Sequence, residues 1–509
     1  MVRGETIMNE GVITNRANIV IIGTGFAGIA AAVRLQQQGE QDFILLERAA
    51  DVGGVWRDNR YPGAACDVES HLYSFSFAPN PDWSRKFSAQ SEIHAYLQEC
   101  ATKFGLMDRI RFKHEVQRLD WDNAAGEWTT QTNQGPFTAP VVIGAFGALS
   151  DPAIPALNGI ERFEGDMFHS ARWPETFDPR GKRIAIVGTG ASAIQFIPEL
   201  QPHAEQLFVF QRTPAWVLPK EDGPISEDER KTYHRHPVRM KTERLKLYVQ
   251  REARVIAFRN PKLLKSVEKM AIRHMEESIK DPALRKKLTP DYKIGCKRIL
   301  LSNNYYPALA QPNVTVDTAG IKEIKTDAVV DGTGQEFPVD AIIFGTGFQV
   351  TNLPFAHHVY GRKGHTLHEE WQGSPYAYMG TTVAGFPNLF LLQGPNTGLG
   401  HTSVILMIEA QVDHVMKVLA FKKQKQFDSI EPSVEAQDRF VRETDQSMEG
   451  TVWTTGGCRS WYLDETGRNS TLWPRTTISF RKKARDFRSA DYVGTKVTEP
   501  RYTGQIAES

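Results

Sequence analysis

The chain has 509 residues, of which 40% are hydrophobic and 24% are charged, and its formal net charge is +1. This length predicts two or three domains, and the balanced charge excludes a general electrostatic attraction to nucleic acid or to an anionic membrane. No apolar run reaches the roughly 18 residues that a membrane span needs, so we expect no span. Residues 1–15 lack an apolar centre and predict a loose N-terminal extension rather than a secretory signal.

The first long element is a nucleotide-binding unit. An apolar strand at 18–22 leads into a glycine-rich turn and a helix over 29–38, and the next strand, 43–46, ends at Glu47. In such a β-α-β unit the glycines make a tight turn and let a pyrophosphate approach the backbone, and the acid accepts hydrogen bonds from a ribose hydroxyl. Glu47 therefore favours an unphosphorylated ribose, as in FAD. The three glycines are Gly23, Gly25 and Gly28.

A second unit of the same kind follows at 183–210. Its first strand, 183–187, enters another glycine-rich turn, in which Ala193 takes the place of the third glycine. The following strand, 207–210, leads to Arg212 instead of an acid. A guanidinium pairs well with a 2′-phosphate, so this unit favours NADP. The residues predicted to contact this cofactor are Gly188, Thr189, Gly190, Ser192, Gln195, Arg212 and Thr213.

The rest of the chain divides around these two units. Between 221 and 290, apolar residues recur at helical spacing, which predicts a mainly helical insertion whose many basic residues form a solvated face. Glycine turns at 144–147 and 345–348 each follow an apolar strand and indicate the crossing points between two interleaved domains. We therefore predict an α/β fold with two Rossmann-like dinucleotide-binding domains and a helical insertion in the second. The predicted boundaries are 1–147 and 385–509 for the FAD domain, 148–220 and 291–384 for the NADP domain, and 221–290 for the insertion.

The four cysteines, Cys66, Cys100, Cys296 and Cys458, are scattered and contain no C-x-x-C pair. This spacing argues against a disulfide scaffold, a thiol redox centre and a zinc site. It predicts reduced thiols and a cytoplasmic protein. We also expect no metal site, since the histidines at 234–236 have no third ligand nearby.

A longer signature lies just before the second unit. The segment 163–174 fits the pattern F-x-G-x-x-x-H-x-x-x-W-P, and by it the chain resembles the Baeyer–Villiger monooxygenases, a branch of the class B flavoprotein monooxygenases. The resemblance covers nearly the whole chain. One small departure is Phe146, which is bulky for a turn between domains. The residues that meet the pattern are Phe163, Gly165, His169, Trp173 and Pro174, and further family-like segments lie at 53–56, 61–67, 296–298 and 394–398.

The resemblance implies a specific chemistry. NADPH would reduce bound FAD, the reduced flavin would react with O₂ to give a peroxide at its C4a carbon, and this peroxide would convert a ketone to an ester or lactone. The resemblance implies that Arg298 supplies a fixed positive charge beside the flavin and that Asp67 holds Arg298. Lys297 would reach the 2′-phosphate together with Arg212, and His169 would lie on the interdomain linker, outside the chemistry. Further cofactor contacts implied by the resemblance are Gly54, Trp56, Asp67, Tyr73, Val116, Asn396 and Trp461.

Other functions use the same frame. An enzyme that oxygenates nitrogen or sulfur would depend less on a fixed positive charge, and Trp173 together with the basic pair 297–298 weighs against it. A non-catalytic flavoprotein that senses NADPH is a second alternative, opposed by the intact motifs. A disulfide reductase is disfavoured because no cysteines are paired in the sequence. We expect the partners to be a small-molecule ketone and O₂, with no nucleic acid, and the chain to be a monomer or a weak homo-oligomer.

Overall fold

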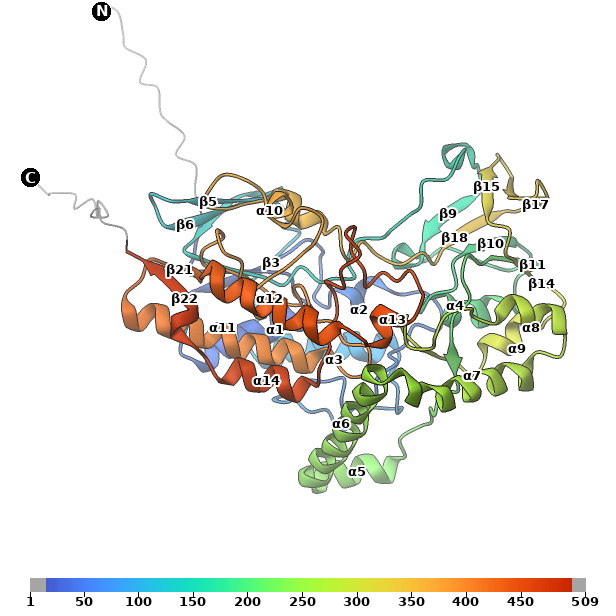
Figure 1. Ribbon diagram of the computed structural model, residues 1–509, viewed down its shortest axis with the longest axis horizontal. Coiled ribbons are helices and arrows are strands. Elements are labelled where there is room, and N and C mark those ends of the chain that lie inside the picture. Colours follow the sequence, from blue (N-terminus) through green and yellow to red (C-terminus); the bar gives the residue numbers. More distant parts are fainter. Residues whose placement is uncertain (1–14, 497–509) are drawn as a thin grey trace, which may run out of the picture.

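Two five-stranded parallel sheets form the frame of the molecule (Figure 1). The computed structural model describes residues 15–496, so the expected N-terminal extension lies outside this range except for Asn15, which belongs to a strand. The first sheet has the order β20-β8-β2-β3-β4, and the second has the order β14-β11-β10-β18-β9. In both sheets the first strand of the nucleotide unit is central and lies beside the strand that follows its helix. The chain thus builds one topology twice, which confirms the predicted α/β class.

The strands of both sheets are short and mostly buried. Those of the first sheet are β20 (Leu389–Leu391), β8 (Val141–Gly144), β2 (Ile19–Ile22), β3 (Phe43–Glu47) and β4 (Ile110–Phe112). Those of the second sheet are β14 (Val314–Asp317), β11 (Gln206–Phe210), β10 (Arg183–Val187), β18 (Ala341–Phe344) and β9 (Asp166–His169). Both faces of each sheet are covered, which explains why the central strand β2 is apolar at every position and β10 at every position after Arg183.

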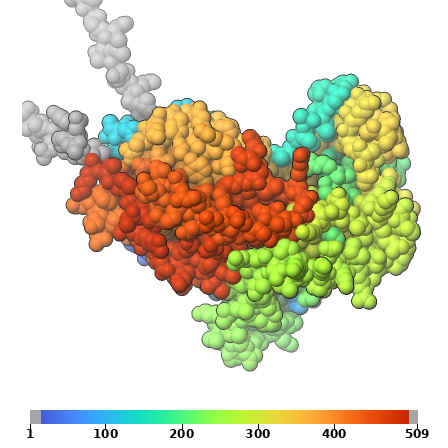
Figure 2. All heavy atoms as spheres, in the orientation of Figure 1, coloured from blue at the N-terminus to red at the C-terminus, as the bar shows by residue number. Residues whose placement is uncertain are grey.

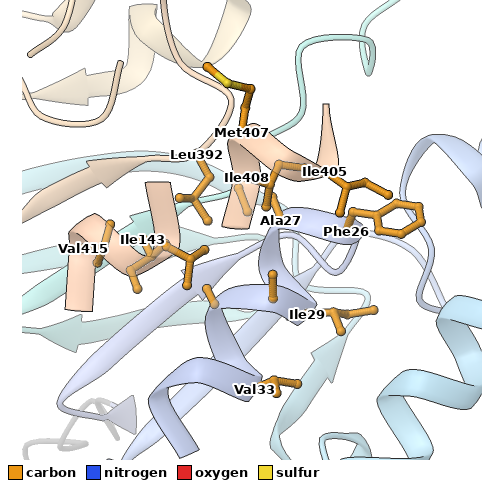
Figure 3. Close-up of a cluster of buried hydrophobic side chains, with 14 of the residues drawn as sticks. Phe26, Ala27, Ile29, Val33, Ile143, Leu392, Ile405, Met407, Ile408 and Val415 are labelled. Atoms are coloured by element: carbon orange, nitrogen blue, oxygen red, sulfur yellow. The ribbon is translucent and has the colours of Figure 1, made fainter. Parts of the chain in front are cut away.

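Helices cover one face of the first sheet. Ile19 and Ile21 of β2 point toward α1 (Phe26–Gln37), α3 (Gln90–Lys103) and α11 (Ile405–Lys425). Figure 3 shows α1 packed against the start of α11, where Ile29 of α1 lies in the same cluster as Ile405 and Ile408. The other face meets a mixed sheet with the order β1-β7-β6-β5-β19. Its strands are β1 (Asn15–Arg16), β7 (Gly135–Ala139), β6 (Glu127–Thr132), β5 (Val116–Asp122) and β19 (Val359–Tyr360).

The second sheet is covered in the same manner. Its helical face packs on α4 (Ala193–Leu200) and α9 (Tyr305–Leu309). Its other face packs on a small antiparallel sheet through Phe210, Phe337 and Ile342. The strands of that small sheet are β15 (Ile321–Ile324), β16 (Ala328–Asp331) and β17 (Glu336–Pro338).

The two predicted glycine turns lie where the chain passes between the sheets. The outgoing and returning links run side by side: the Ala153 N–H donates to the Gly347 carbonyl at 2.9 Å, and the Gln349 N–H donates to the Asp151 carbonyl at 2.9 Å. The bulk of Phe146 is accommodated by stacking on Phe355, with ring centroids 4.1 Å apart.

Residues 221–290 are mainly helical, as expected. Figures 1 and 2 show α5 and α6 projecting from the lower edge of the molecule. The helices of this region are α5 (Glu227–Arg235), α6 (Pro237–Arg259), α7 (Lys265–Ser278) and α8 (Pro282–Leu288). The remaining elements used below are α2 (Val55–Asp58), β13 (Leu300–Leu301), α12 (Val434–Met448), α13 (Val452–Thr455), α14 (Thr477–Arg485) and β22 (Tyr492–Thr495). Within residues 15–496, no helix is both long and apolar enough to cross a membrane.

We expect Gly28→Ala to destabilise the protein by at least about 2 kcal/mol, because the added Cβ would lie 1.9 Å from the Gly23 carbonyl oxygen. Gly25→Ala is the matched control, since a Cβ there comes no closer than 3.8 Å to the Gly54 Cα. Thermal unfolding of the two cofactor-free variants, followed by circular dichroism, measures the difference. Equal melting temperatures would contradict this packing.

Candidate active site

The structure brings Asp67 and Arg298 together from 231 residues apart in the sequence. Arg298 Nε donates to Asp67 Oδ2 at 2.8 Å, and Nη2 donates to Oδ1 at 2.7 Å. The pair is therefore bidentate, the arrangement in which a guanidinium binds a carboxylate most strongly. Less than a third of each side chain is exposed, 29% for Arg298 and 27% for Asp67.

Each member of the pair keeps the other charged. Burial by itself raises the pKa of Asp67, but the Arg298 charge and its hydrogen bonds outweigh burial, so the net pKa is lowered. The carboxylate in turn raises the pKa of Arg298 above its ordinary value against the opposing effect of burial. The site therefore contains a permanent, oriented positive charge at any pH at which the protein is folded and Asp67 is ionised.

Helix α6 holds the segment that carries Asp67. Arg251 Nε pairs with Glu69 Oε2 at 2.7 Å, and its Nη2 donates to the Asp67 carbonyl at 3.0 Å. Two turns earlier in α6, Arg244 donates to the carbonyls of His71, at 2.6 Å, and Ser74, at 3.0 Å. We expected the basic residues of this region to form a solvated face, and for these two arginines that expectation is wrong. Their seven-residue spacing places both on the same side of α6 as its buried apolar residues, which is the signal that could have found them.

The predicted FAD-side residues gather around the turn between β2 and α1. No side chain caps α1 at Gly25, so its first N–H groups have no competing side-chain acceptor. Gly54, just before α2, packs on this turn, since a Cβ at Gly54 would lie 3.2 Å from the Gly25 Cα. Trp56 Nε1 donates to Tyr73 Oη at 3.1 Å, with the two rings edge to face. Val116 lies at the start of β5, half-buried beside the same sheet.

Glu47 is buried at the end of β3, where it was predicted, but its oxygens already have partners. Oε2 accepts from the Thr24 N–H at 3.2 Å and from the Thr24 hydroxyl at 2.6 Å. Oε1 accepts from the Ala49 N–H at 2.9 Å and pairs with Arg57 at 2.9 Å. A ribose hydroxyl would therefore need to displace the Thr24 hydroxyl or the Arg57 guanidinium.

The predicted NADP-side residues lie around the turn between β10 and α4. The Thr189 hydroxyl donates to the Thr213 carbonyl at 3.1 Å, which joins the ends of two neighbouring strands. Burial lowers the pKa of Lys297, and the positive charge of Arg212 lowers it further. The two cations therefore lie within range of each other's charge, although 85 residues separate them in the sequence. A pair of close cations is an arrangement that an anion would stabilise. Gly188, Gly190 and Ser192 form the turn itself, and no side chain caps α4.

Two predicted contacts have other partners in the structure. Gln195 Oε1 accepts from Tyr61 Oη at 3.0 Å, and its Nε2 donates to the Ala65 carbonyl at 3.0 Å, so it docks α4 onto the segment that leads to Asp67. The amide of Asn396, which is 3% exposed, donates to the Asn469 carbonyl at 2.8 Å and accepts from Arg468 at 2.8 Å.

His169 is buried at the end of β9, and burial lowers its pKa to about 4, so the ring is neutral near pH 7. Its Nδ1 accepts from the Ala171 N–H at 3.1 Å. Trp173 of the same signature packs edge to face on Phe168 and contacts Phe196 of α4. The signature therefore packs β9, the edge strand of the second sheet, against α4.

The structure corrects the prediction for the cysteines. Cys296 and Cys458 form a disulfide, with Cα atoms 6.2 Å apart, although 162 residues separate them in the sequence. Cys66 and Cys100 are free and buried. Sequence spacing could not show this pair, because the disulfide joins the stretch before β13 to a loop after α13. Cys296 immediately precedes Lys297. Trp461, 44% of whose surface is exposed, lies in the same loop as Cys458.

Several buried polar atoms beside the pair lack a protein partner. Three of them lie in the stretch that leads into α11, close to Leu399, whose carbonyl is 3.5 Å from Arg298 Nη1. The fourth is the hydroxyl of Tyr462, whose pKa burial raises to about 12 against the opposing charge of Arg298. Such atoms fit hydrogen bonding to a bound polar group such as a flavin ring. The atoms are His401 Nδ1, Thr402 Oγ1, Ser403 Oγ and Tyr462 Oη.

Metal ligands do not gather anywhere in the part of the chain that the structure describes: residues 15–496 contain no group of three or more His, Cys, Asp or Glu side chains placed to hold an ion. His234, one of the histidines considered above, pairs with Asp82 at 2.7 Å.

Comparison with known proteins agrees with these features. Residues 16–362 match the family model described as Flavin-binding monooxygenase-like. A Baeyer-Villiger monooxygenase of Streptomyces coelicolor is 50% identical over 497 residues, covering 94% of this chain and 95% of that protein. One from Pseudomonas aeruginosa is 49% identical over 477 residues, covering 93% of this chain and 90% of that protein.

Solved structures show the same similarity. A closed crystal structure of cyclohexanone monooxygenase superimposes with a TM-score of 0.86 at 26% identity, covering 95% of this chain and 100% of that one. An oxidized steroid monooxygenase bound to NADP gives 0.84 at 30% identity with the same coverage. The chain belongs to the flavin-binding monooxygenase-like family, and within it to the Baeyer–Villiger monooxygenases. It is an FAD- and NADPH-dependent oxygen-inserting enzyme, as the sequence predicted.

Protein that is purified and unfolded without reductant is expected to titrate two thiols, those of Cys66 and Cys100, and four after reduction. A Cys458→Ser variant should titrate three without reductant, because Cys296 loses its partner. A thiol reagent in denaturant measures both. Four thiols in the unreduced sample would contradict the disulfide.

Proposed function

We propose that Arg298 is the fixed positive charge of the oxygen-insertion site and that Asp67 positions it. The observation that carries this proposal is the bidentate, mostly buried pair between the two side chains. Bound FAD would supply the redox chemistry by accepting hydride from NADPH and activating O₂. Arg298 would stabilise the negative charge that develops on oxygen during insertion, because a preorganised guanidinium need not reorient during the reaction.

The nucleotide turns would divide the two cofactors between them. Gly23, Gly25 and Gly28 would face the FAD pyrophosphate at the start of α1, with Glu47 on its ribose. The turn that ends in α4 would hold NADP, and Arg212 and Lys297 would pair with its 2′-phosphate. The mutual repulsion of these two cations supports this assignment, since a bound anion would offset it. Further cofactor contacts are proposed at Gly54, Trp56, Tyr73, Val116, Gly188, Thr189, Gly190, Ser192, Gln195, Thr213, Asn396 and Trp461.

The proposed FAD domain comprises 1–147 and 385–509, and the proposed NADP domain comprises 148–220 and 291–384, with the insertion at 221–290. The membership of β20 in the first sheet and of β18 in the second supports this division. We propose that the substrate is a small ketone and the product an ester or lactone, in line with relatives named for cyclohexanone and steroids.

We further propose that the enzyme works in the cytoplasm as a monomer or weak homo-oligomer. Two features support the cytoplasm: the enzyme consumes NADPH, and the thiols of Cys66 and Cys100 are free. The disulfide is uncommon for that compartment, but Cys296 is only 1% exposed, and burial would protect the bond from exchange with soluble thiols.

We expect Arg298→Ala to leave reduction of bound FAD by NADPH within about tenfold of the wild type. Ester formation from cyclohexanone should fall by about 10²–10³-fold, the usual effect of removing one preorganised electrostatic donor. Anaerobic stopped-flow absorbance measures reduction, and gas chromatography measures the ester. Arg298→Lys keeps the charge without the bidentate geometry and should recover part of the lost activity. Ester formation at the wild-type rate in Arg298→Ala would refute the role.

Arg212→Ala is expected to raise the KM for NADPH by about 10- to 100-fold, the effect of losing a hydrogen bond to a charged group. The KM for NADH should change little, because NADH has no 2′-phosphate. Arg180→Ala is the control, since this exposed arginine pairs with Asp178 before β10, at the opposite end of the parallel strands. Equal losses with NADPH and NADH would exclude phosphate recognition.

A further inference from the structure

The outer face of α6 carries a stripe of exposed aliphatic side chains. Val238, Leu245, Val249 and Ile256 are 72%, 57%, 59% and 59% exposed. At about 100° per residue, these four fall within about 40° of one another around the helix. The opposite side of α6 packs on the protein through the buried Phe258 and Arg251 and through the half-buried Arg244. Single exposed aliphatic residues are common on proteins, but four aligned along one side of a single helix are a feature of interaction surfaces.

Exposed basic residues flank this stripe on both sides. Lys241 and Arg259 lie about 60° to one side of it, and Lys246 and Arg239 lie about 80–100° to the other. We use the name outer face for these four residues together with the aliphatic stripe. The arrangement is that of an amphipathic helix that lies in an interface, with apolar residues in the middle and cations along both edges.

Neither acidic residue of α6 offers an unpaired carboxylate to the outer face, although Glu252 falls only about 40° from the centre of the stripe. Glu252 is buried and accepts hydrogen bonds from the backbone and the hydroxyl of Thr477, at 2.9 and 2.7 Å. Glu243 is partly covered, with 32% of its side chain exposed. Glu243 also pairs with Lys246 at 3.4 Å. The outer face is therefore positive in a chain whose net charge is only +1.

The position of α6 leaves this face accessible. Figure 2 shows the green segment that contains α5 and α6 projecting below the rest of the molecule. The four aliphatic side chains of this projecting helix are each more than half exposed, so the outer face is accessible.

We infer that the outer face of α6 binds the surface of a lipid bilayer that carries anionic headgroups. The four aliphatic side chains would enter the boundary between headgroups and acyl chains, and the flanking Lys and Arg side chains would remain at the level of the phosphates. A second copy of the chain fits this face less well, because both flanks are basic and pairing two copies would place like charges together. The inference is independent of the proposed roles of Arg298 and Asp67.

The test is co-sedimentation of the intact FAD-bound enzyme with vesicles. Binding to vesicles of phosphatidylcholine with phosphatidylglycerol is expected to be at least about tenfold tighter than to phosphatidylcholine alone, and to weaken as salt is added. The triple variant L245Q/V249Q/I256Q should bind the anionic vesicles at least about tenfold more weakly, because its aliphatic stripe is lost. NADPH consumption by this variant in solution should be unchanged.

The matched control is V434Q/I478Q/V493Q, which removes exposed aliphatic residues of similar accessibility, 56%, 56% and 51%, from α12, α14 and β22. Its vesicle binding should equal that of the wild type. Equal binding by the two triple variants, or no preference of the wild type for anionic vesicles, would overturn the inference. Analytical ultracentrifugation tests whether a second copy of the chain occupies this face instead. That would be the conclusion if the wild type forms a dimer, L245Q/V249Q/I256Q does not, and the wild type does not bind vesicles.

Discussion

The bidentate pair between Asp67 and Arg298 is the interaction on which the arrangement of the site depends. Asp67 belongs to a segment beside the first parallel sheet, whereas Arg298 lies in the stretch before β13, so the pair joins the two nucleotide units. Loss of either partner would leave a partly buried charge without its partner, which is destabilising. The structure supports both ends of the pair: Arg251 holds the backbone of Asp67, and the disulfide at Cys296 anchors the stretch that carries Arg298.

Features that are local in the sequence could be predicted, and features that join distant segments could not. The β2-α1-β3 unit is recognisable because strand, glycine turn, helix and acid follow one another within about thirty residues, each with its own backbone requirement. The contact between Arg251 and Glu69 spans 182 residues, and no local pattern records it. Glu47 shows that even a residue in a recognisable local pattern can have partners that the pattern does not predict. Its position was predicted, but its buried bonds to Thr24 and Arg57 were not.

The segment 163–174, whose pattern is the most specific in the chain, has contacts that stabilise the fold. Trp173 packs against Phe168 and Phe196, and His169 ends β9 as a buried, neutral ring. These residues secure the edge strand of the second sheet next to the link between the sheets. A motif can thus identify a family through side chains whose contacts in the structure are with neighbouring strands and helices. The residues proposed for chemistry, such as Arg298, are instead single side chains in loops, where sequence patterns are weakest.

Helix α6 connects the site to the surface through its two opposite sides. Arg251 faces inward to Glu69 and Asp67, while Val249, two residues earlier, faces outward with more than half of its surface exposed. The inward side explains why the insertion cannot be a passive solvated appendage. The outward side explains how a chain of nearly zero net charge can present a strongly basic, partly apolar face, since net charge averages over the whole surface whereas binding depends on the local field. Because the two sides point in opposite directions, substitutions on the outer face leave the inward contacts intact.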